Sequence, residues 1–350
     1  MTDDSSTPHL RRPRYQGTHP RAFHEKYKEL DPDRYAEDVA KVTASGKTPA
    51  GSHRPIMVRE VLDVLALAPG QFAIDATLGY GGHASALLEA VQPGGRLLAI
   101  DVDPIEVRKA EVRLRARAVT PESLIVRQGN FAALPRLLAE DSLPAADAVI
   151  ADLGLSSMQI DDPARGFTYK RPGPLDLRMN PHRGHPASTL LASISAAKLT
   201  RLLDENADQP DAERLAEALV AHQSRCPITR TTELADAVRE AVHAGPRSSG
   251  DEAETSIRRV FQALRIAVND EFGALQTFLH GLPQCLAPGG RVAILTFHSG
   301  EDRRVKRALR DGASAGIYAS VAETVGRATA EERRANPRAA SAKLRWAIRA

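Results

Sequence analysis

The sequence predicts an α/β fold with an open, Rossmann-like parallel sheet that is interrupted by a large helical insertion. Short apolar segments alternate with helical patterns as far as Asp152, which is typical of successive βαβ units. The alternation then stops, and 138 residues separate Asp152 from the next buried strand at Arg291. Because a crossover between parallel strands needs only a few tens of residues, roughly 100 of these residues form an insertion.

The first half of the sheet is predicted from four apolar segments and the helical patterns between them. The strands are expected at Phe72–Asp75, Arg96–Asp101, Leu124–Gln128 and Ala148–Asp152. The helices are expected at Gly82–Val91, Ile105–Ala118 and Ala132–Glu140. A helix packed against the first strand should precede them, because apolar residues recur at helical spacing at Ile56, Val61, Leu62 and Leu65.

The insertion opens with an irregular stretch, residues 153–186, rich in proline, glycine and arginine. Helical patterns follow at Ser188–Asn206, Asp211–Arg225 and Thr232–His243, then a loop at Ala244–Glu252. One long amphipathic helix is predicted over Ser256–Leu286, and its single apolar stripe should pack on the sheet. A buried strand at Arg291–Phe297 and a last strand at Lys343–Arg349, closing an edge, complete the sheet.

Four parts are therefore expected along the chain. Residues 1–50 are polar and lack a sustained period, which predicts a flexible extension with one short helix at Asp33–Thr43. The α/β domain occupies residues 51–155 and 253–350, and the inserted, mostly helical domain occupies residues 156–252.

Composition indicates a soluble cytoplasmic protein. Hydrophobic residues make up 42% and charged residues 26%, and no apolar run is long enough to span a membrane. The N-terminus has no apolar core of a secretory signal. Cys226 and Cys285 are isolated, which fits a reducing compartment and predicts neither a disulfide framework nor a metal site.

Positive charge is concentrated near the C-terminus. The net charge of the chain is only +3, but residues 301–350 hold 12 Lys or Arg against 6 Asp or Glu, a net +6. Five basic residues lie within eight positions, at Arg303, Arg304, Lys306, Arg307 and Arg310. Two interpretations stay open, a solvated helix face and a surface that contacts phosphates.

The chemistry-bearing residues begin at the glycine-rich turn after the first strand, with Asp75, Gly79, Gly81, Gly82 and His83. This turn has neither the GxGxxG spacing of dinucleotide sites nor a P-loop. An acid at the first strand tip, a loose glycine turn and an acid at the second strand tip together suggest S-adenosylmethionine. That ligand has no phosphates, and its positive amino and sulfonium groups favour nearby carboxylates.

Three further positions are expected at this end of the sheet. Asp101, followed by Asp103, is typical of an acid that binds ribose hydroxyls. Phe131 follows the third strand, where it either contacts adenine or is an ordinary core residue. Asp152 ends the fourth strand, where it either binds the cofactor or helps to orient an amine acceptor.

Several blocks of the chain resemble the ribosomal RNA small subunit methyltransferase H family. The blocks DLGLSSMQIDDPARGF, residues 152–167, and GPLDLRM, residues 173–179, are the most specific. The resemblance covers about residues 52–350. It implies a class I methyltransferase sheet with an inserted helical substrate-recognition domain, S-adenosylmethionine as donor, and N4-methylation of one cytidine at the decoding centre of 16S rRNA. It also implies cofactor contacts from Gly81, Gly82, His83, Asp101, Phe131, Asp152 and Gln159.

An RNA base reaches such a site only when it is unstacked, and proteins hold unstacked bases with aromatic and arginine side chains. The substrate candidates are Arg165, Phe167, Tyr169, Arg171, Arg178, His298 and Arg303. For each, a structural role stays open: Phe167 could cover a core, and the arginines could pair with Asp161, Asp162 and Asp176. No general base is identified, and Asp152 is the one catalytic candidate.

The chain departs from the family pattern at three places. Gly300 stands in FHSGEDR, where the family usually has leucine, and the segments 205–216 and 254–259 also differ. A divergent relative that methylates another RNA, a protein or a small-molecule amine is the alternative function, and a non-catalytic RNA-binding module is a third. The oligomeric state, a homodimer included, is left open.

Overall fold

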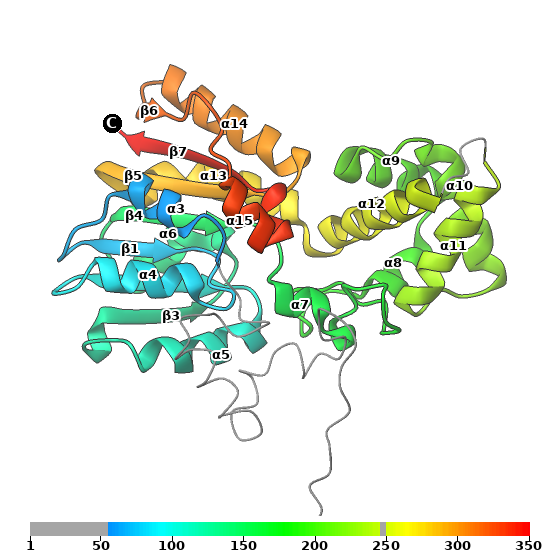
Figure 1. The fold of residues 1–350 in the computed structure, drawn as a ribbon, viewed down its shortest axis with the longest axis horizontal. Helices are drawn as coiled ribbons and strands as arrows, with labels where there is room; N and C mark the ends of the chain where they lie inside the picture. Colours follow the sequence, from blue (N-terminus) through cyan, green and yellow to red (C-terminus); the bar gives the residue numbers. More distant parts are fainter. Residues whose placement is uncertain (1–54, 246–249) are drawn as a thin grey trace, which may run out of the picture. The chain divides into compact units, whose positions relative to one another are not determined.

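The computed structural model describes residues 55–245 and 250–350, which form an α/β domain and a group of inserted helices (Figure 1). The described strands form one seven-stranded sheet in the order β3-β2-β1-β4-β5-β7-β6. Strands β1 to β5 are parallel, and β7 runs antiparallel to both of its neighbours. The strands are β1 Phe72–Asp75, β2 Arg96–Asp101, β3 Leu124–Gln128, β4 Ala146–Asp152, β5 Leu286–Thr296, β6 Tyr318–Val321 and β7 Lys343–Arg349. The predicted Rossmann-like fold class is confirmed.

Both faces of the central strands are buried, as expected of parallel strands with helices on both sides. Alternate residues of β1 and β2 therefore enter two different cores: Ile74 and Leu98 lie in one, and Ala73 and Leu97 lie in the other. The first core is completed by α6 Leu134–Glu140, α13 Glu271–Cys285 and α14 Ser299–Ser314. The second is completed by α3 Val58–Leu65, α4 Gly82–Ala90 and α5 Pro104–Arg115, with residues of the C-terminal segment around α15 Ala330–Ala335.

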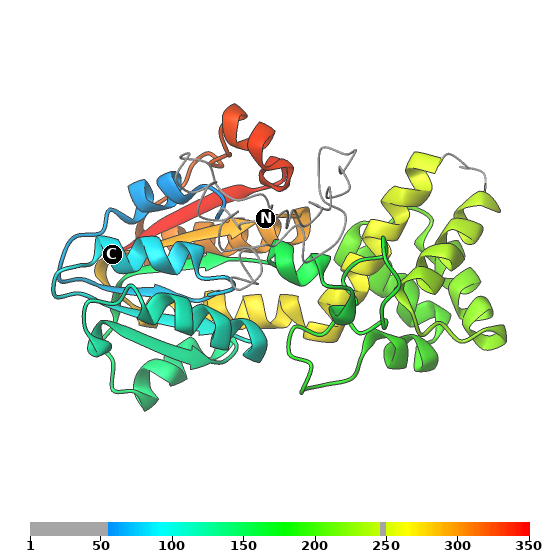
Figure 2. The same cartoon turned by 60° about the horizontal axis from the view of Figure 1, so that its bottom comes forward.

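The inserted helices have a hydrophobic core of their own. They are α8 Ala187–Ser193, α9 Ala196–Ala207, α10 Ala212–Arg225, α11 Thr231–His243 and α12 Gly250–Asn269, and they pack on one another (Figure 2). Their core also includes Phe167, Leu175 and Leu177 of the irregular stretch before α8. That stretch contains one short α-helix, α7 Ser157–Asp161, and a single 3₁₀ turn at Pro163–Arg165.

The predicted long helix over Ser256–Leu286 is wrong, because the chain forms two helices that break at Asp270. Asp270 has a left-handed backbone with φ 49°, a conformation that aspartate tolerates better than most residues. The apolar residues of α12 pack into the insertion core, and only those of α13 pack on the sheet. The apolar stripe predicted for one helix therefore packs into two separate cores. Its regular spacing continues across Asp270, so the spacing gives no sign that the helix breaks there.

Smaller differences concern the edges of elements. Strand β7 does not close an edge as predicted, because β6, a four-residue strand that was not predicted, lies outside it. The pattern over Ser188–Asn206 forms two helices, α8 and α9, separated at Ile194, and α12 begins at Gly250 inside the expected loop. Helix α3 packs on α4, β4 and β5 rather than mainly on β1.

The expected extension and its helix at Asp33–Thr43 lie outside the described residues. Within the described ranges, no helix combines the length and the hydropathy needed to cross a bilayer.

Candidate functional site

A pocket of about 750 Å³ opens at the carboxyl ends of β1, β2, β4 and β5. From β1 the chain adds β2 and β3 on one side of the sheet and then crosses to add β4 and β5 on the other side. Ligands of open α/β sheets bind at the switch point between the two halves, which here lies between β1 and β4. The residues that follow or end these strands line the pocket, namely Ala76, Thr77, Asp101, Val102, Asp152, Leu153, Phe297 and His298.

The turn between β1 and α4 needs glycine at two positions, one for its backbone conformation and one for lack of space. Gly81 precedes α4 with a left-handed φ of 87°, which side chains other than glycine rarely adopt. A Cβ on Gly82 would lie 2.7 Å from Pro55 Cγ, so only glycine fits there. Gly82 and His83 line the pocket, whereas Gly81 shapes the turn from behind, against Ala110 and Leu114.

Asp101 ends β2 and ties the glycine turn to the next loop. Its Oδ2 accepts a hydrogen bond from Gly79 N at 2.6 Å, and its Oδ1 accepts one from Asp103 N at 2.9 Å. Burial nevertheless raises the pKa of Asp101 to about 7, because these two bonds only partly replace the lost water. The carboxylate lines the pocket and is a ready acceptor for donors of a ligand.

Asp75, His83 and Asp152 form an ionisable cluster beside it. His83 Nε2 lies 3.6 Å from Asp152 Oδ2, and both Asp75 and His83 are buried. Burial raises the pKa of Asp75 to about 6. Burial alone would lower the pKa of His83, but the neighbouring Asp152 and Asp75 outweigh it and raise that pKa. Asp152 Oδ1 and Asp75 Oδ2 are buried without a hydrogen-bond partner among the described residues.

We expect the free protein to be less stable at about pH 7.5 than at about pH 5.5. A raised pKa at Asp75 and Asp101 means that the folded chain binds more protons than the unfolded chain, so stability is lost as pH rises through that window. Each group contributes at most about 1.4 kcal/mol per pH unit, and we expect a net loss of about 1–3 kcal/mol. Urea denaturation at both pH values measures it, and a rise in stability over this range would contradict these pKa shifts.

Gln159 and Phe131 also line the pocket. Gln159 lies in α7, where its Oε1 accepts from Ser156 N at 2.9 Å and its Nε2 donates to Asp103 Oδ2 at 2.7 Å. The ring of Phe131 packs edge-to-face on Phe278, with centroids 5.2 Å apart. The structure thus brings six of the seven predicted cofactor residues to one pocket, with Gly81 just behind it.

Most of the predicted substrate residues do not reach this pocket. Arg165 is buried and forms an ion pair with Asp103 at 2.7 Å, and Phe167 is buried in the insertion core. Arg178 forms a two-pronged pair with Asp176, which lowers the pKa of that carboxyl despite partial burial. Arg178 thus pairs with one of the three acids considered for the arginines, whereas Arg165 pairs with Asp103, which was not among them, and Phe167 covers a core.

Two of the other candidates are also occupied within the fold. Arg171 donates to the backbone oxygen of Asp161, and the Tyr169 ring lies 5.4 Å from that of Phe261. Of the substrate candidates, His298 lines the pocket. Arg303 is exposed and pairs with Asp208 at 3.1 Å.

The wall nearest β5 contains residues that the sequence did not single out. Glu301 is buried and accepts from Phe297 N at 2.8 Å, and Arg265 pairs with Glu271 at 2.7 Å. Phe272 fills the space at Gly300, since a Cβ there would lie 2.6 Å from Phe272 Cζ. The departure at Gly300 is thus matched by an aromatic ring at the pocket wall.

Comparison with known proteins identifies the family. Residues 50–350 match the sequence profile of the MraW methylase family. The chain belongs to the MraW methylase family. Among curated relatives, ribosomal RNA small subunit methyltransferase H 1 of Lachnoclostridium phytofermentans is 48% identical over 100% of this chain and 95% of its own length. Ribosomal RNA small subunit methyltransferase H 2 of Alkaliphilus metalliredigens is 47% identical over 99% of this chain and 100% of its own.

Membership of the MraW methylase family confirms the resemblance seen in the sequence.

In the part of the chain that the structure describes, no group of three or more His, Cys, Asp or Glu side chains is arranged to hold a metal ion.

Proposed function

We propose that this protein transfers a methyl group from S-adenosylmethionine to the exocyclic N4 amine of one cytidine at the decoding centre of 16S rRNA. The observation that carries the donor assignment is the pocket at the switch point, where Asp101 and Asp152 line the wall and the buried Asp75 ends the strand between theirs. Carboxylates in this place suit a cationic adenosine ligand and oppose a phosphorylated one. The names of the curated relatives support small subunit rRNA as acceptor.

In this proposal, one set of residues at the pocket binds the cofactor, and another orients the cytosine. Asp101 accepts hydrogen bonds from the ribose, Phe131 contacts the adenine, and Gly81, Gly82, His83, Asp152 and Gln159 complete the cofactor site. The bound group supplies an electrophilic methyl. The protein's own task is to exclude water and to hold the two reactants in line.

The cytosine amine is a poor nucleophile because its lone pair is delocalised into the ring. Acceptors that hold its protons would turn the lone pair toward the methyl group. Asp152 is suited to this task, because its buried Oδ1 has no hydrogen-bond partner among the described residues and it ends the strand next to β5. His298, on the β5 side of the same pocket, is placed to contact the unstacked base.

The expected inserted domain, residues 156–252, shares its core with α12, which runs to Asn269, and we propose that this larger unit recognises the substrate. A ribosomal substrate is found in the cytoplasm, so the proposal includes a cytoplasmic location for the protein.

Incubation with labelled S-adenosylmethionine and small subunits from a strain that lacks the enzyme tests the proposal. We expect label in 16S rRNA, with a mass increase of one methyl group on a single cytidine. Subunits from the parent strain, already modified, are the control and should take up little label. A protein that binds the cofactor but labels a ribosomal protein, or nothing, would overturn the proposed acceptor.

A further inference from the structure

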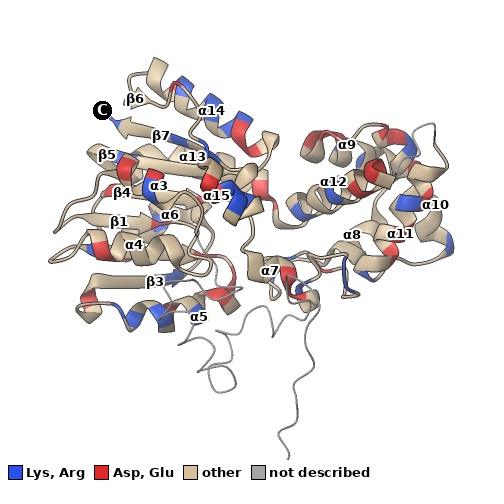
Figure 3. Cartoon of the chain, viewed as in Figure 1, with Lys and Arg blue, Asp and Glu red and all other residues tan. Residues whose placement is uncertain are grey.

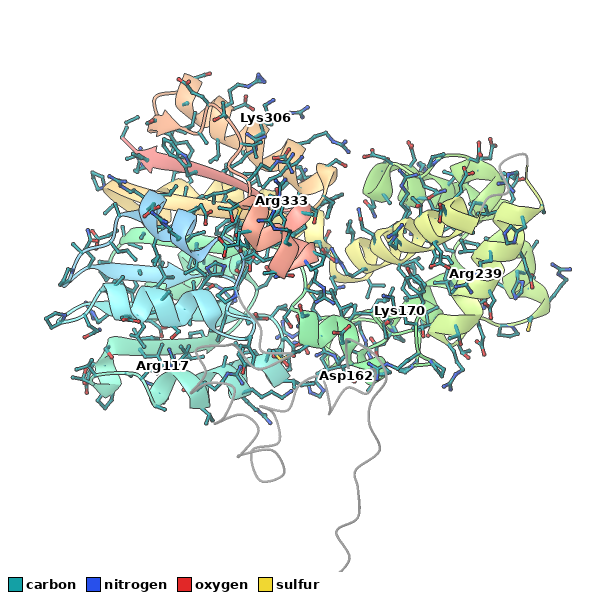
Figure 4. All side chains as sticks on the ribbon, in the orientation of Figure 1. Arg117, Asp162, Lys170, Arg239, Lys306 and Arg333 are labelled. Carbon is teal, nitrogen blue, oxygen red and sulfur yellow. The ribbon has the colours of Figure 1, made fainter. Side chains whose placement is uncertain are left out.

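Helix α14 has four exposed basic residues on one side, with Asp311 as the one exposed acid next to them. Arg303, Lys306, Arg307 and Arg310 are all exposed, and at about 100° per residue they fall within one third of the helix circumference. The opposite side, with Val305, Leu309 and Gly312, is buried against the sheet. We call these four residues the α14 basic face; basic residues along the helix are visible in Figure 3, and Lys306 is labelled in Figure 4.

Most of this charge has no counter-charge. Arg303 pairs with Asp208 of the insertion, but Lys306, Arg307 and Arg310 form no ion pair with any described residue. Burial lowers the pKa of the neighbouring Arg304, and the nearby charges of Arg303 and Arg307 lower it further, as expected among cations that repel each other. An exposed helix face is usually stabilised by evenly mixed charges, so a face with four cations beside the single acid Asp311 points to a partner of negative charge.

The position of the helix indicates where that partner lies. Helix α14 follows directly after Phe297 and His298, which line the pocket, and Arg303 is the first exposed cation beyond them. From Arg303 to Arg310 the helix rises about 10 Å, with a cation at every turn or closer. A strand whose target nucleotide occupies the pocket would meet this row as it leaves.

We propose that the α14 basic face binds the phosphodiester backbone of the RNA that flanks the target nucleotide. Arginine and lysine are the usual phosphate ligands, and arginine binds phosphate in a two-pronged geometry. The inference rests on the proposed function for the identity of the RNA. It adds a second contact surface, outside the pocket and outside the inserted helices.

The test compares two variants that remove equal charge. The first carries Lys306→Gln, Arg307→Gln and Arg310→Gln on α14. The control carries Arg96→Gln, Arg108→Gln and Arg117→Gln, three exposed cations in β2, α5 and the turn after α5 that form no ion pair with a described residue. Helix α5 packs on β3 and β2 and α14 on β6 and β7, so the two sets belong to opposite ends of the sheet. Glutamine keeps helix propensity, and both variants should bind S-adenosylmethionine like the wild type.

Binding of a labelled 16S rRNA fragment containing the decoding region is measured between about 50 and 200 mM salt. Each phosphate contact on single-stranded RNA contributes about 0.7 to the slope of log affinity against log salt. We expect the α14 variant to lose about 2 in slope and about 10- to 100-fold in affinity, while the control changes less than about threefold.

On unmodified subunits, the α14 variant should raise KM and leave kcat near the wild-type value, because backbone contacts are present in ground and transition states alike. Equal losses of RNA affinity in both variants, or a wild-type salt slope in the α14 variant, would show that the α14 basic face is only solvated and does not contact RNA. RNA binding is read without catalysis, so this result is independent of whether the cytidine is methylated.

Discussion

Replacing Asp101 with asparagine is expected to abolish measurable binding of S-adenosylmethionine while leaving the protein folded. The carboxylate is the acidic end of β2 in the pocket, and an acid in this position accepts both ribose hydroxyls in adenosine sites of this fold. Asparagine offers one oxygen and presents an NH₂ group where the second hydroxyl would donate. Loss of one charge-assisted and one further hydrogen bond predicts at least about a 100-fold weaker affinity.

The same substitution should cost little stability, because two effects on folding oppose each other. One of the two backbone donors, Gly79 N or Asp103 N, loses its acceptor, which costs about 1–3 kcal/mol. The burial that raises the pKa of Asp101 to about 7 also means that its charge destabilises the fold above that pH, and asparagine removes this cost. The net change at about pH 8 should therefore lie within roughly 2 kcal/mol.

Isothermal titration calorimetry measures the affinity, and urea denaturation measures the stability of the same samples. Asp63→Asn is the control, because Asp63 is a surface carboxylate paired with Arg59 at 3.8 Å and should change neither quantity. Wild-type affinity in Asp101→Asn would remove the ribose assignment. Unfolding of that variant at about pH 8 would instead show that the carboxylate is chiefly structural.

The central strands could be predicted closely because they are buried on both faces. β1 and β2 are mainly apolar segments bounded by turns, and their limits agree with the prediction, as do those of β3, an edge strand whose last two residues are exposed. β6 was missed because it has only four residues, two of them exposed, and so shows no apolar run. The position of β7 inside the sheet depends on β6, and strand order is not encoded in the alternation of elements.

The meeting of the proposed cofactor residues in one pocket was predictable, because several of them end or directly follow strands. Asp101 and Asp152 end β2 and β4, so the topology brings them together. The substrate side was not, because a side chain in an irregular stretch is placed by distant partners. Arg165 pairs with Asp103, 62 positions away, and its residue type alone does not distinguish this buried pair from an arginine that contacts RNA.

The buried Asp103–Arg165 pair gives the second large expected effect. Asp103 is fully buried; its Oδ1 accepts from Ile105 N at the start of α5, and its Oδ2 accepts from Arg165 and Gln159. Arg165 in turn donates to Met179 O at 2.7 Å. These contacts join the loop after β2 to the irregular stretch of the insertion, so breaking them should loosen both.

Arg165→Met is expected to lower the free energy of unfolding by about 3–5 kcal/mol, because it leaves a buried carboxylate without its cation. Arg178→Met is the matched control in the same stretch. Arg178 and Asp176 are partly exposed, and the loss should be about 1 kcal/mol or less. Urea denaturation of both variants and the wild type measures the two losses of stability. Equal losses would contradict the expectation that the buried Asp103–Arg165 pair contributes more stability than the partly exposed Arg178–Asp176 pair.

A double variant separates the charge from the packing. Asp103→Asn combined with Arg165→Met leaves no unpaired buried charge, and asparagine is as good a helix cap as aspartate. The double variant should therefore be more stable than Arg165→Met alone, by about 1–3 kcal/mol. Its affinity for S-adenosylmethionine should still fall, because the single oxygen of asparagine cannot accept from both Ile105 N and Gln159 Nε2, and Gln159 lines the pocket. Recovered stability without recovered affinity would show that this pair positions the cofactor site, whereas recovery of both would assign it to folding alone.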